Sequence, residues 1–124
     1  MLGESKAFSG FSVDDTAAAK RFYGETLGLN VTEADGMLEL HLATGARVFV
    51  YPKRDHRPAA FTILNFPVAD IGKTVADLKA RGVSFESYDM PGLKTDEDDV
   101  FRGGGPHIAW FTDPAGNILS VLAE

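Results

Sequence analysis

The order of strand-like and helix-like segments constrains this chain more than any other feature. A strand-like segment, an amphipathic helical segment and three further strand-like segments follow one another, and the same order then recurs. With a shift of 55 residues, Val13 falls on Val68 and Asp15 falls on Asp70. Two similar helices in an unrelated α+β domain are the alternative explanation. The matching order of every element in both halves favours an internal repeat.

Each half is expected to contain one helix. The first helix is expected over residues 16–26, with Asp14 and Asp15 as the candidate N-caps and Gly28 after its end. The second is expected over residues 71–80, with Asp70 as its N-cap and Gly82 after its end. The expected strands share apolar or alternating patterns bounded by turn residues, and they cover residues 8–13, 29–33, 37–43, 47–52, 61–68, 83–88, 107–111 and 118–122.

The last two expected strands are separated by residues 113–117, Asp-Pro-Ala-Gly-Asn. Asp113 is able to accept hydrogen bonds from the backbone just ahead of it, and Pro114 has the φ that a type I turn needs at its second position. Gly116 adopts a positive φ without steric cost. These residues predict a β-hairpin with a bulged loop. Because a terminal strand stays ordered only when it is paired, we expect this hairpin to lie inside a sheet.

Composition limits the classes of function. The chain has 124 residues, no cysteine and a net charge of −6. The absence of cysteine excludes disulfides, thiolate metal sites and cysteine nucleophiles, and the negative charge argues against nucleic acid as a partner. No segment approaches the roughly 20 apolar residues that cross a bilayer, and the first residues lack the apolar core of a signal peptide. We therefore expect a single cytoplasmic domain over residues 1–124 with no membrane partner.

Two segments carry a resemblance to a known family. VDDTAAAKRFYGETLGL in the first half and WFTDPAGNILSVL near the C-terminus resemble the vicinal oxygen chelate superfamily, which includes glyoxalases, extradiol dioxygenases and bleomycin-resistance proteins. The resemblance covers nearly the whole chain. It implies an α+β fold with two βαβββ modules, about residues 6–54 and 59–124, forming one curved, mixed, eight-stranded sheet with the helices on its convex face. The motifs are specific for the fold and not for a function.

The resemblance also implies where a divalent metal would be held. Enzymes of the family bind the metal on four side chains, and these positions fall on Phe8, on Phe49 or Val50, on Ile63 and on Ser120. Three apolar groups and a hydroxyl lack the oxygen or imidazole ligands that such an ion needs. The sequence therefore predicts no metal and no other cofactor, and it argues against glyoxalase, dioxygenase and metal-dependent transferase activity.

The third and fourth strands predict a ligand-binding face. If residues 44–46 form their connecting loop, the apolar residues Leu38, Leu40, Leu42, Val48 and Val50 share the face that suits the helices. The concave face then carries Glu39, His41, Arg47, Phe49 and Tyr51. A two-residue loop would mix the two sets, because a slip by one residue reverses the faces of a strand. Convergent charged and aromatic groups suit a polar aromatic ligand, and a solvated cluster of ion pairs is the alternative.

The segment of residues 89–105 joins the sixth and seventh strands. It is too long for a simple hairpin loop and has glycines at one end, so we expect a lid over the ligand. Met90, Leu93 and Phe101 are its apolar residues. The acidic run at residues 96–99 lacks the spacing of a calcium-binding loop and is expected to be solvated.

These observations favour a metal-free small-molecule-binding protein of the bleomycin-resistance kind, and the resemblance implies a homodimer. The expected ligand-binding residues are Phe8, Glu39, His41, Arg47, Phe49, Tyr51, Ile63, Asn65, Met90, Leu93, Trp110 and Ser120. One alternative is an enzyme, either a lyase or isomerase that uses His41, Glu39 or Tyr51 as acid or base, or a metal enzyme with a displaced site at Glu39, His41 and His107. The other is an interaction domain whose cavity is packed shut. No catalytic residue is assigned, and His56 is expected to be exposed and without a role in binding.

Overall fold

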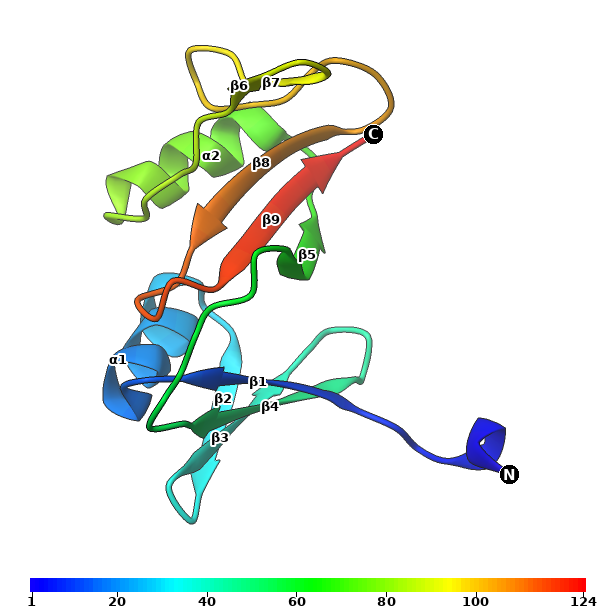
Figure 1. The fold of residues 1–124 in the computed structure, drawn as a ribbon, viewed down its shortest axis with the longest axis vertical. Helices are drawn as coiled ribbons and strands as arrows, with labels where there is room; N and C mark the ends of the chain where they lie inside the picture. The colour runs from blue at the N-terminus through cyan, green and yellow to red at the C-terminus, as the bar shows by residue number, and fades with distance from the viewer. The chain divides into compact units, whose positions relative to one another are not determined.

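A computed structural model describes all residues, 1–124, and the chain forms two compact units, Met1–Arg57 and Pro58–Glu124. Each unit has one main helix and one mixed sheet, which confirms the α+β class (Figure 1). The first unit contains η1 (Leu2–Glu4), β1 (Ser9–Val13), α1 (Thr16–Arg21), η2 (Phe22–Thr26), β2 (Asn30–Ala34), β3 (Met37–His41) and β4 (Arg47–Pro52). The second contains β5 (Thr62–Pro67), α2 (Ile71–Ala80), β6 (Asp89–Met90), β7 (Leu93–Lys94), β8 (His107–Thr112) and β9 (Ile118–Ala123). None of the helices is long and apolar enough to span a bilayer.

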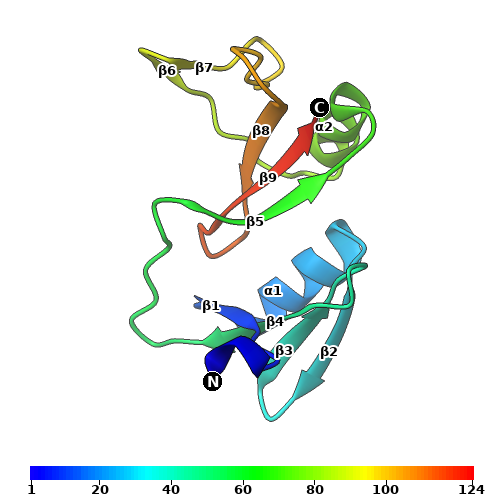
Figure 2. The same cartoon turned by 90° about the vertical axis from the view of Figure 1, so that its right-hand side faces the viewer.

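The first unit is a four-stranded sheet with a helix on one face (Figure 2). Its strand order is β1-β4-β3-β2, with β1 parallel to β4 and the other pairs antiparallel. Alternate residues of β3 and β4 are buried on the face that α1 covers, as the sequence predicted. These residues are Leu38, Leu40, Val48 and Val50.

The first helix begins and ends where the sequence predicts. The Asp15 carboxylate accepts a hydrogen bond from the Ala18 N–H at 3.1 Å, which satisfies one free donor of the first turn. From Phe22 onward the helix widens into the π-helical turn η2, which keeps the predicted residues 16–26 in one helical segment. Gly28, with φ of 77°, then ends it.

The second unit repeats this plan. Its sheet has the order β5-β9-β8, with β5 parallel to β9 and β8 antiparallel to it. Asp70 caps α2 by accepting from the Lys73 N–H at 3.0 Å, as Asp15 caps α1. The strand β9 lies between β5 and β8, so the last strand is interior to its sheet, as expected for a terminal strand.

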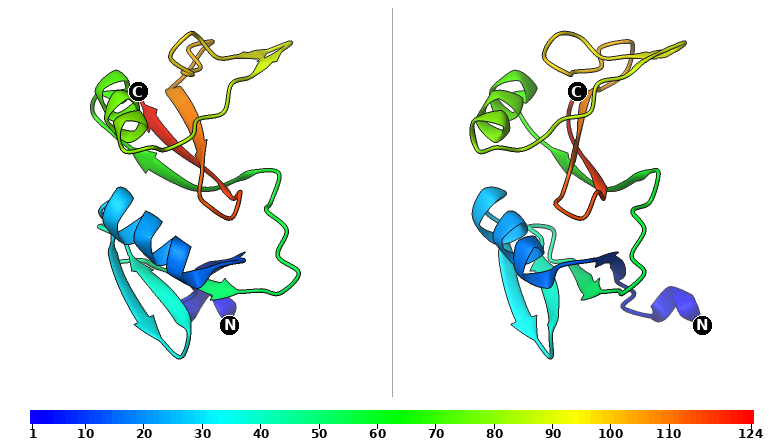
Figure 3. Two further views of the ribbon diagram at one scale, coloured as in Figure 1. Left: turned by 90° about the vertical axis from the view of Figure 1, so that its left-hand side faces the viewer. Right: turned by 60° about the vertical axis from the view of Figure 1, so that its left-hand side comes forward.

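The structure does not contain the single eight-stranded sheet. The strands form separate sheets of four, three and two strands, and residues 83–88 are not a regular strand. Phe85 makes only an isolated bridge with Phe111. The Tyr88 N–H donates to Thr95 Oγ1 at 2.9 Å and the Tyr88 carbonyl accepts from the Thr95 N–H at 2.9 Å. These two bonds turn the backbone away from β8 and toward the β6–β7 hairpin, which Figure 3 shows in yellow.

The loop between β3 and β4 begins one residue earlier than predicted. The Leu42 N–H donates to the Ala46 carbonyl at 2.9 Å, and the Gly45 N–H donates to the Leu42 carbonyl at 3.0 Å. Residues 43–45 therefore form the loop, and Gly45 supplies its positive φ of 92°. The pairing of β3 with β4 is therefore shifted by an even number of residues from the pairing that a loop at residues 44–46 would give. Both predicted faces are therefore preserved.

The turn between β8 and β9 is built around the Asp113 carboxylate. It accepts hydrogen bonds from the Ala115 N–H at 2.9 Å, the Asn117 N–H at 2.8 Å and the Asn117 side-chain amide at 3.0 Å. Asp113 is 4% exposed and Asn117 is 2% exposed. Gly116, with φ of 86°, closes the predicted turn.

We expect Asp113→Ala to destabilise the protein by about 2 kcal/mol, because it leaves buried N–H donors without an acceptor. Urea unfolding followed by circular dichroism measures the change. The control is Asp98→Ala, which removes an exposed carboxylate. Equal stabilities of the two variants would show that the Asp113 hydrogen bonds do not hold the hairpin.

Candidate functional site

The sheet face of the first unit that lies opposite α1 carries the predicted charged and aromatic residues. Glu39 pairs with Phe49 across β3 and β4, and His41 pairs with Arg47 in the same ladder. Because directly paired residues in a sheet project to the same side, these four side chains share one face. Tyr51 follows on β4 at the same two-residue period.

Arg47 is the centre of this face. Its guanidinium donates to the Glu39 carboxylate at 3.0 Å and lies 5.7 Å from the centroid of the Phe8 ring. The Phe8 and Phe49 rings contact each other edge to face, with centroids 6.1 Å apart. These four residues enclose a small cavity of about 70 Å³. We call Phe8, Glu39, Arg47 and Phe49 the Arg47 cluster.

The Arg47 cluster is open to solvent. The side chains of Arg47 and Glu39 are 55% and 31% exposed, and Phe8 is 61% exposed. An ion pair with this exposure contributes only about 0–1 kcal/mol to stability. The Arg47–Glu39 ion pair therefore contributes little to the stability of the fold, and its guanidinium stays accessible beside an exposed ring.

Two histidines of the first unit have partners on neighbouring segments. His41 Nε2 lies 2.8 Å from Thr32 Oγ1 on β2. His56 is half-buried, and its Nδ1 lies 2.7 Å from Ser12 Oγ on β1. The prediction that His56 is simply exposed is wrong, because the connector folds back onto β1. No local pattern signals this contact, since the two residues are 44 positions apart.

The second unit brings three of the predicted residues together. Ser120 is fully buried, and its hydroxyl donates to the Asn65 side-chain carbonyl at 2.5 Å. Trp110 pairs with Ser120 across the hairpin. The Trp110 ring contacts Tyr88 at 5.4 Å and Phe101 at 6.2 Å between centroids. Burial raises the pKa of Tyr88, with a smaller contribution from Glu86, so its phenol stays protonated at neutral pH.

The other predicted residues of the second unit lie elsewhere. Ile63 sits at the register shift between Thr62 and Leu64, where β5 has one residue more than β9. Met90 and Leu93 face each other in the short β6–β7 hairpin, and Met90 is 49% exposed. Among the apolar residues of the predicted lid, Phe101 is the one in ring contact with Trp110.

The prediction that the acidic run at residues 96–99 is solvated is wrong for two of its carboxylates. Asp96 accepts from the Asp98 and Val100 N–H groups at 2.9 and 3.0 Å and from Arg102 Nε at 2.9 Å. The bond from the Val100 N–H is the main cause that lowers the pKa of Asp96. Asp99 accepts from the Ser87 hydroxyl, which is the main cause that lowers its pKa, and it pairs with Lys79 at 3.0 Å. Asp96 therefore holds the segment through bonds within it, and Asp99 ties the segment to Ser87 and to Lys79 of α2.

The metal positions implied by the family do not fit a metal in this chain. Phe8 and Phe49 are in ring contact, and the Ser120 hydroxyl is bonded to Asn65. The side chains considered for a displaced site also have other partners: His41 contacts Thr32, Glu39 pairs with Arg47, and Arg102 lies 3.0 Å from His107 Nδ1. The structure contains no group of three His, Asp or Glu side chains arranged to hold a metal ion.

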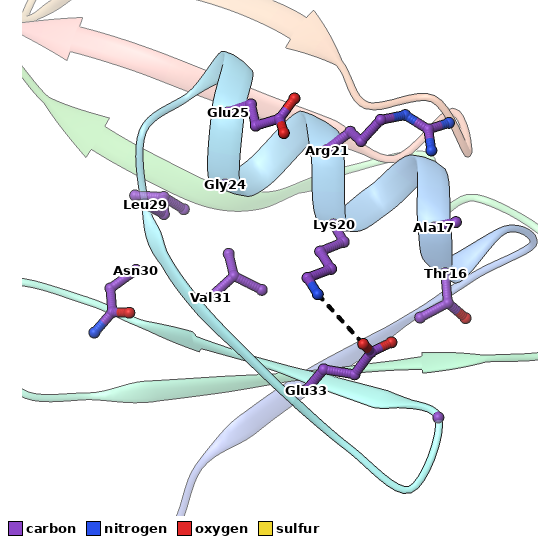
Figure 4. Close-up of a pocket in the computed structure, with 11 residues that line it drawn as sticks. Thr16, Ala17, Lys20, Arg21, Gly24, Glu25, Leu29, Asn30, Val31 and Glu33 are labelled. Carbon is purple, nitrogen blue, oxygen red and sulfur yellow. Dashed lines mark hydrogen bonds and ion pairs between the residues drawn. The ribbon is translucent and has the colours of Figure 1, made fainter.

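The first unit also has a groove that the sequence analysis missed (Figure 4). It lies between α1–η2 and β2, has a volume of about 860 Å³, and is spanned by an ion pair from Lys20 Nζ to Glu33 Oε1 at 3.3 Å. Its lining residues are Thr16, Ala17, Lys20, Arg21, Gly24, Glu25, Leu29, Asn30, Val31, Glu33 and Gly36. The helical spacing of Ala17, Lys20 and Gly24 places these residues on one side of α1–η2, but the sequence does not show which strand that side faces.

Comparisons with known proteins agree with this architecture. Residues 8–121 match the family described as the Glyoxalase/Bleomycin resistance protein/Dioxygenase superfamily. No curated protein matches the chain. A glyoxalase family protein from Enterococcus faecalis has a similar structure, with a TM-score of 0.69 and 23% identity over 98% of this chain and 99% of that one.

Two further solved structures have names that describe resistance or binding. The fosfomycin resistance protein FosX from Listeria monocytogenes has a TM-score of 0.71 and 10% identity, over 98% of this chain and 93% of that one. The antibiotic binding protein TnmS3 from Streptomyces sp. CB03234 has a TM-score of 0.63 and 21% identity, over 97% of each chain. At these identities the similarity shows the fold alone.

Asp96 and Asp99 predict the acid limb of the stability curve. Their folded pKa values lie below the ordinary value of 3.8, so the stability they contribute is present above about pH 4 and is lost as the pH falls through the folded pKa values. We expect Asp96→Asn to lower the free energy of unfolding by about 0.5–1 kcal/mol at pH 7 and by less at pH 3. Urea unfolding at the two pH values measures this difference.

The matched control is Glu97→Gln, which neutralises an exposed carboxylate of the same run and should change little at either pH. A deficit of Asp96→Asn that stays constant from pH 7 to pH 3, or that grows in acid, would contradict the assignment.

Proposed function

Because the chain belongs to the glyoxalase/bleomycin resistance/dioxygenase superfamily, we propose that it is a metal-free protein that binds a small organic molecule. The Arg47 cluster carries this proposal. There an exposed guanidinium is held by Glu39 at 3.0 Å and lies over an exposed aromatic ring. The resemblance places two of the enzymes' metal-ligand positions at Phe8 and at Phe49 or Val50, so we propose that this chain offers apolar side chains where those enzymes offer donors.

The chemistry of the Arg47 cluster favours an aromatic ligand with an anionic group. The ring of Phe8 offers an accessible surface for stacking on one side of Arg47. The planar guanidinium has five N–H donors, and the bond to Glu39 is made by one of its terminal nitrogens. A carboxylate or similar group on the ligand therefore finds donors beside the ring on which its aromatic part stacks.

The second unit supplies a second set of groups suited to an aromatic ligand. Trp110, flanked by Tyr88 and Phe101, offers aromatic surface, and the exposed Asn65 side chain, held by the buried Ser120 hydroxyl, offers hydrogen-bonding groups. We propose that these residues, together with the others predicted from the sequence, bind the ligand, and that Phe101 is the part of the lid nearest to it. Trp110 is half-buried, so part of its ring remains accessible to a ligand.

Binding without reaction is the function that the side-chain partners favour. Glu39 is engaged by Arg47 and His41 by Thr32, so two of the three acid or base candidates are bonded to a neighbouring side chain. Sequestration of a ligand needs only complementarity and no proton transfer. The antibiotic binding protein TnmS3, which has the same fold, is named for binding. We also propose that the protein works in the cytoplasm as one domain and as a homodimer.

We expect no transition metal in the protein when it is purified without a chelator. The apolar and hydroxyl side chains at the family's ligand positions cannot replace the water around a divalent ion. Elemental analysis by mass spectrometry measures the content. Near one equivalent of zinc, nickel, iron or manganese per chain would refute the metal-free proposal.

We expect small aromatic carboxylates to raise the melting temperature, and aromatic alcohols of the same size to raise it less. For the best carboxylate of such a panel, Arg47→Ala should weaken binding by about tenfold or more, since it removes a charge-assisted hydrogen bond. Calorimetric titration measures the affinity. Arg54→Ala removes an exposed arginine of the connector and is the matched control. Equal affinities of both variants would place the anionic group elsewhere.

A further inference from the structure

A serine and a histidine form a hydrogen-bonded pair on the sheet face that carries the Arg47 cluster. Ser12 Oγ of β1 lies 2.7 Å from Nδ1 of His56, and both residues are half-buried. Ser12 pairs with Tyr51 in the parallel β1–β4 ladder, so its side chain projects to the face on which Tyr51 and Phe49 lie. The Ser12–His56 pair therefore lies on the face to which the proposed function assigns the ligand.

The backbone of the connector holds His56 in this position. The chain leaves β4 beside the end of β1, and the Lys53 N–H donates to the Val13 carbonyl at 2.9 Å (Figure 1). The His56 N–H then donates to the Lys53 carbonyl at 3.0 Å, which closes a tight turn over residues 53–56. Because backbone bonds fix the turn, the imidazole is placed beside Ser12 before any ligand binds.

The geometry of the pair suits activation of the Ser12 hydroxyl. A serine hydroxyl is a weak nucleophile, and a base within about 2.6–3.2 Å activates it by accepting its proton. In the neutral tautomer with its proton on Nε2, His56 offers Nδ1 as the acceptor, and Nδ1 is the nitrogen that faces Ser12. The chain has a second hydroxyl–imidazole contact, between Thr32 and His41, but that one is exposed. The half-buried Ser12–His56 pair is more shielded from competing water.

The strand β1 connects the Arg47 cluster with Ser12. Phe8, Gly10 and Ser12 follow one another on this face, and a Cβ added at Gly10 would lie 3.4 Å from Phe49 Cβ. No side chain of β1 therefore stands between Phe8 and Ser12, which are roughly 13 Å apart along the strand. An aryl ester with a para carboxylate spans a distance of this order, once a hydrogen bond to Arg47 and contact with Ser12 are included.

We propose that Ser12 is a nucleophile that accepts the acyl group of an aryl ester whose carboxylate is bound by Arg47. The Ser12 hydroxyl oxygen forms a bond to the ester carbonyl carbon, and its proton passes to His56 Nδ1. The bond between that carbon and the phenolic oxygen then breaks, and the proton leaves His56 with the phenol. The products are acyl-Ser12 and a free phenol, so the step needs no further reagent and returns His56 to its neutral form.

This step rests on the proposed function for the placement of the ligand and goes beyond it by adding a covalent bond. The guanidinium of Arg47 selects the carboxylate, and the exposed Phe8 ring offers surface to the aromatic part. A phenol is a good leaving group, which suits a hydroxyl activated by one imidazole. Tyr51, which pairs with Ser12, carries an O–H donor on the same face for the negative charge that develops on the carbonyl oxygen.

Acetylation by 4-acetoxybenzoate tests the substrate class, with phenyl acetate, which lacks the carboxylate, as the comparison. We expect peptide mapping by mass spectrometry to find one acetyl group on Ser12 of the natural protein. The reaction should be about tenfold or more faster with 4-acetoxybenzoate, because a charge-assisted hydrogen bond to Arg47 holds that ester. Ser12→Ala should lose this acetyl group and still bind 4-hydroxybenzoate in a calorimetric titration. Acetylation of lysines alone would overturn the proposal.

A fluorophosphonate tests the Ser12–His56 pair without Arg47, because it reacts with activated serines and carries no carboxylate. We expect the rate of labelling at Ser12 to fall by about a hundredfold or more in His56→Gln, with an unchanged circular dichroism spectrum. Ser9→Ala removes an exposed hydroxyl of the same strand and is the matched control, with labelling as in the natural protein. Equal rates for the natural protein and His56→Gln would overturn the pair.

The two probes separate this inference from the proposed function. If the fluorophosphonate labels Ser12 but the two esters acetylate it at equal rates, the Arg47 cluster does not hold the carboxylate, and the assigned ester class is overturned with that placement. If 4-hydroxybenzoate binds with an affinity that depends on Arg47 but neither probe labels Ser12, the binding site stands and the nucleophile is overturned.

Discussion

The two-residue alternation of β3 and β4 is the constraint on which the first unit depends. It places Leu38, Leu40, Val48 and Val50 under α1, where each is at most 6% exposed. The intervening residues are thereby forced to the opposite face, whatever their chemistry. A basic, an acidic and two aromatic side chains meet there because the hydrophobic core fixes the register. The candidate site is therefore a consequence of how the core is packed.

In the second unit, hydrogen bonds and ion pairs of polar side chains hold the backbone where regular strand pairing stops. Thr95 captures both backbone groups of Tyr88, and Asp96 and Asp99 hold the segment that follows. These bonds place Phe101 against Trp110. Because Asp96 and Asp99 accept hydrogen bonds from N–H and hydroxyl groups and pair with cations, these two carboxylates hold the segment, while Glu97 and Asp98 of the same run stay exposed.

Local signals made much of this structure predictable. Asp15 and Asp70 as N-caps fixed where the helices begin, and the hairpin at Asp113 followed from the turn preferences of each residue. The two faces of β3 and β4 were predicted correctly, because the loop between them shifts the pairing by an even number of residues and so leaves each side chain on its predicted face. Contacts between residues that are distant in the sequence could not be predicted. The Ser12–His56 contact and the Lys20–Glu33 ion pair join residues 44 and 13 positions apart, and no periodicity encodes either of them.

We propose that the Arg47 cluster, on the face opposite α1, receives the ligand. A titration of the isotopically labelled protein with an aromatic carboxylate, followed through the backbone amide resonances, tests this placement. We expect the largest shifts at Glu39, Arg47 and Phe49, with the amides of α1 nearly unchanged. Shifts confined to the groove between α1 and β2, with no change at Arg47, would contradict the account.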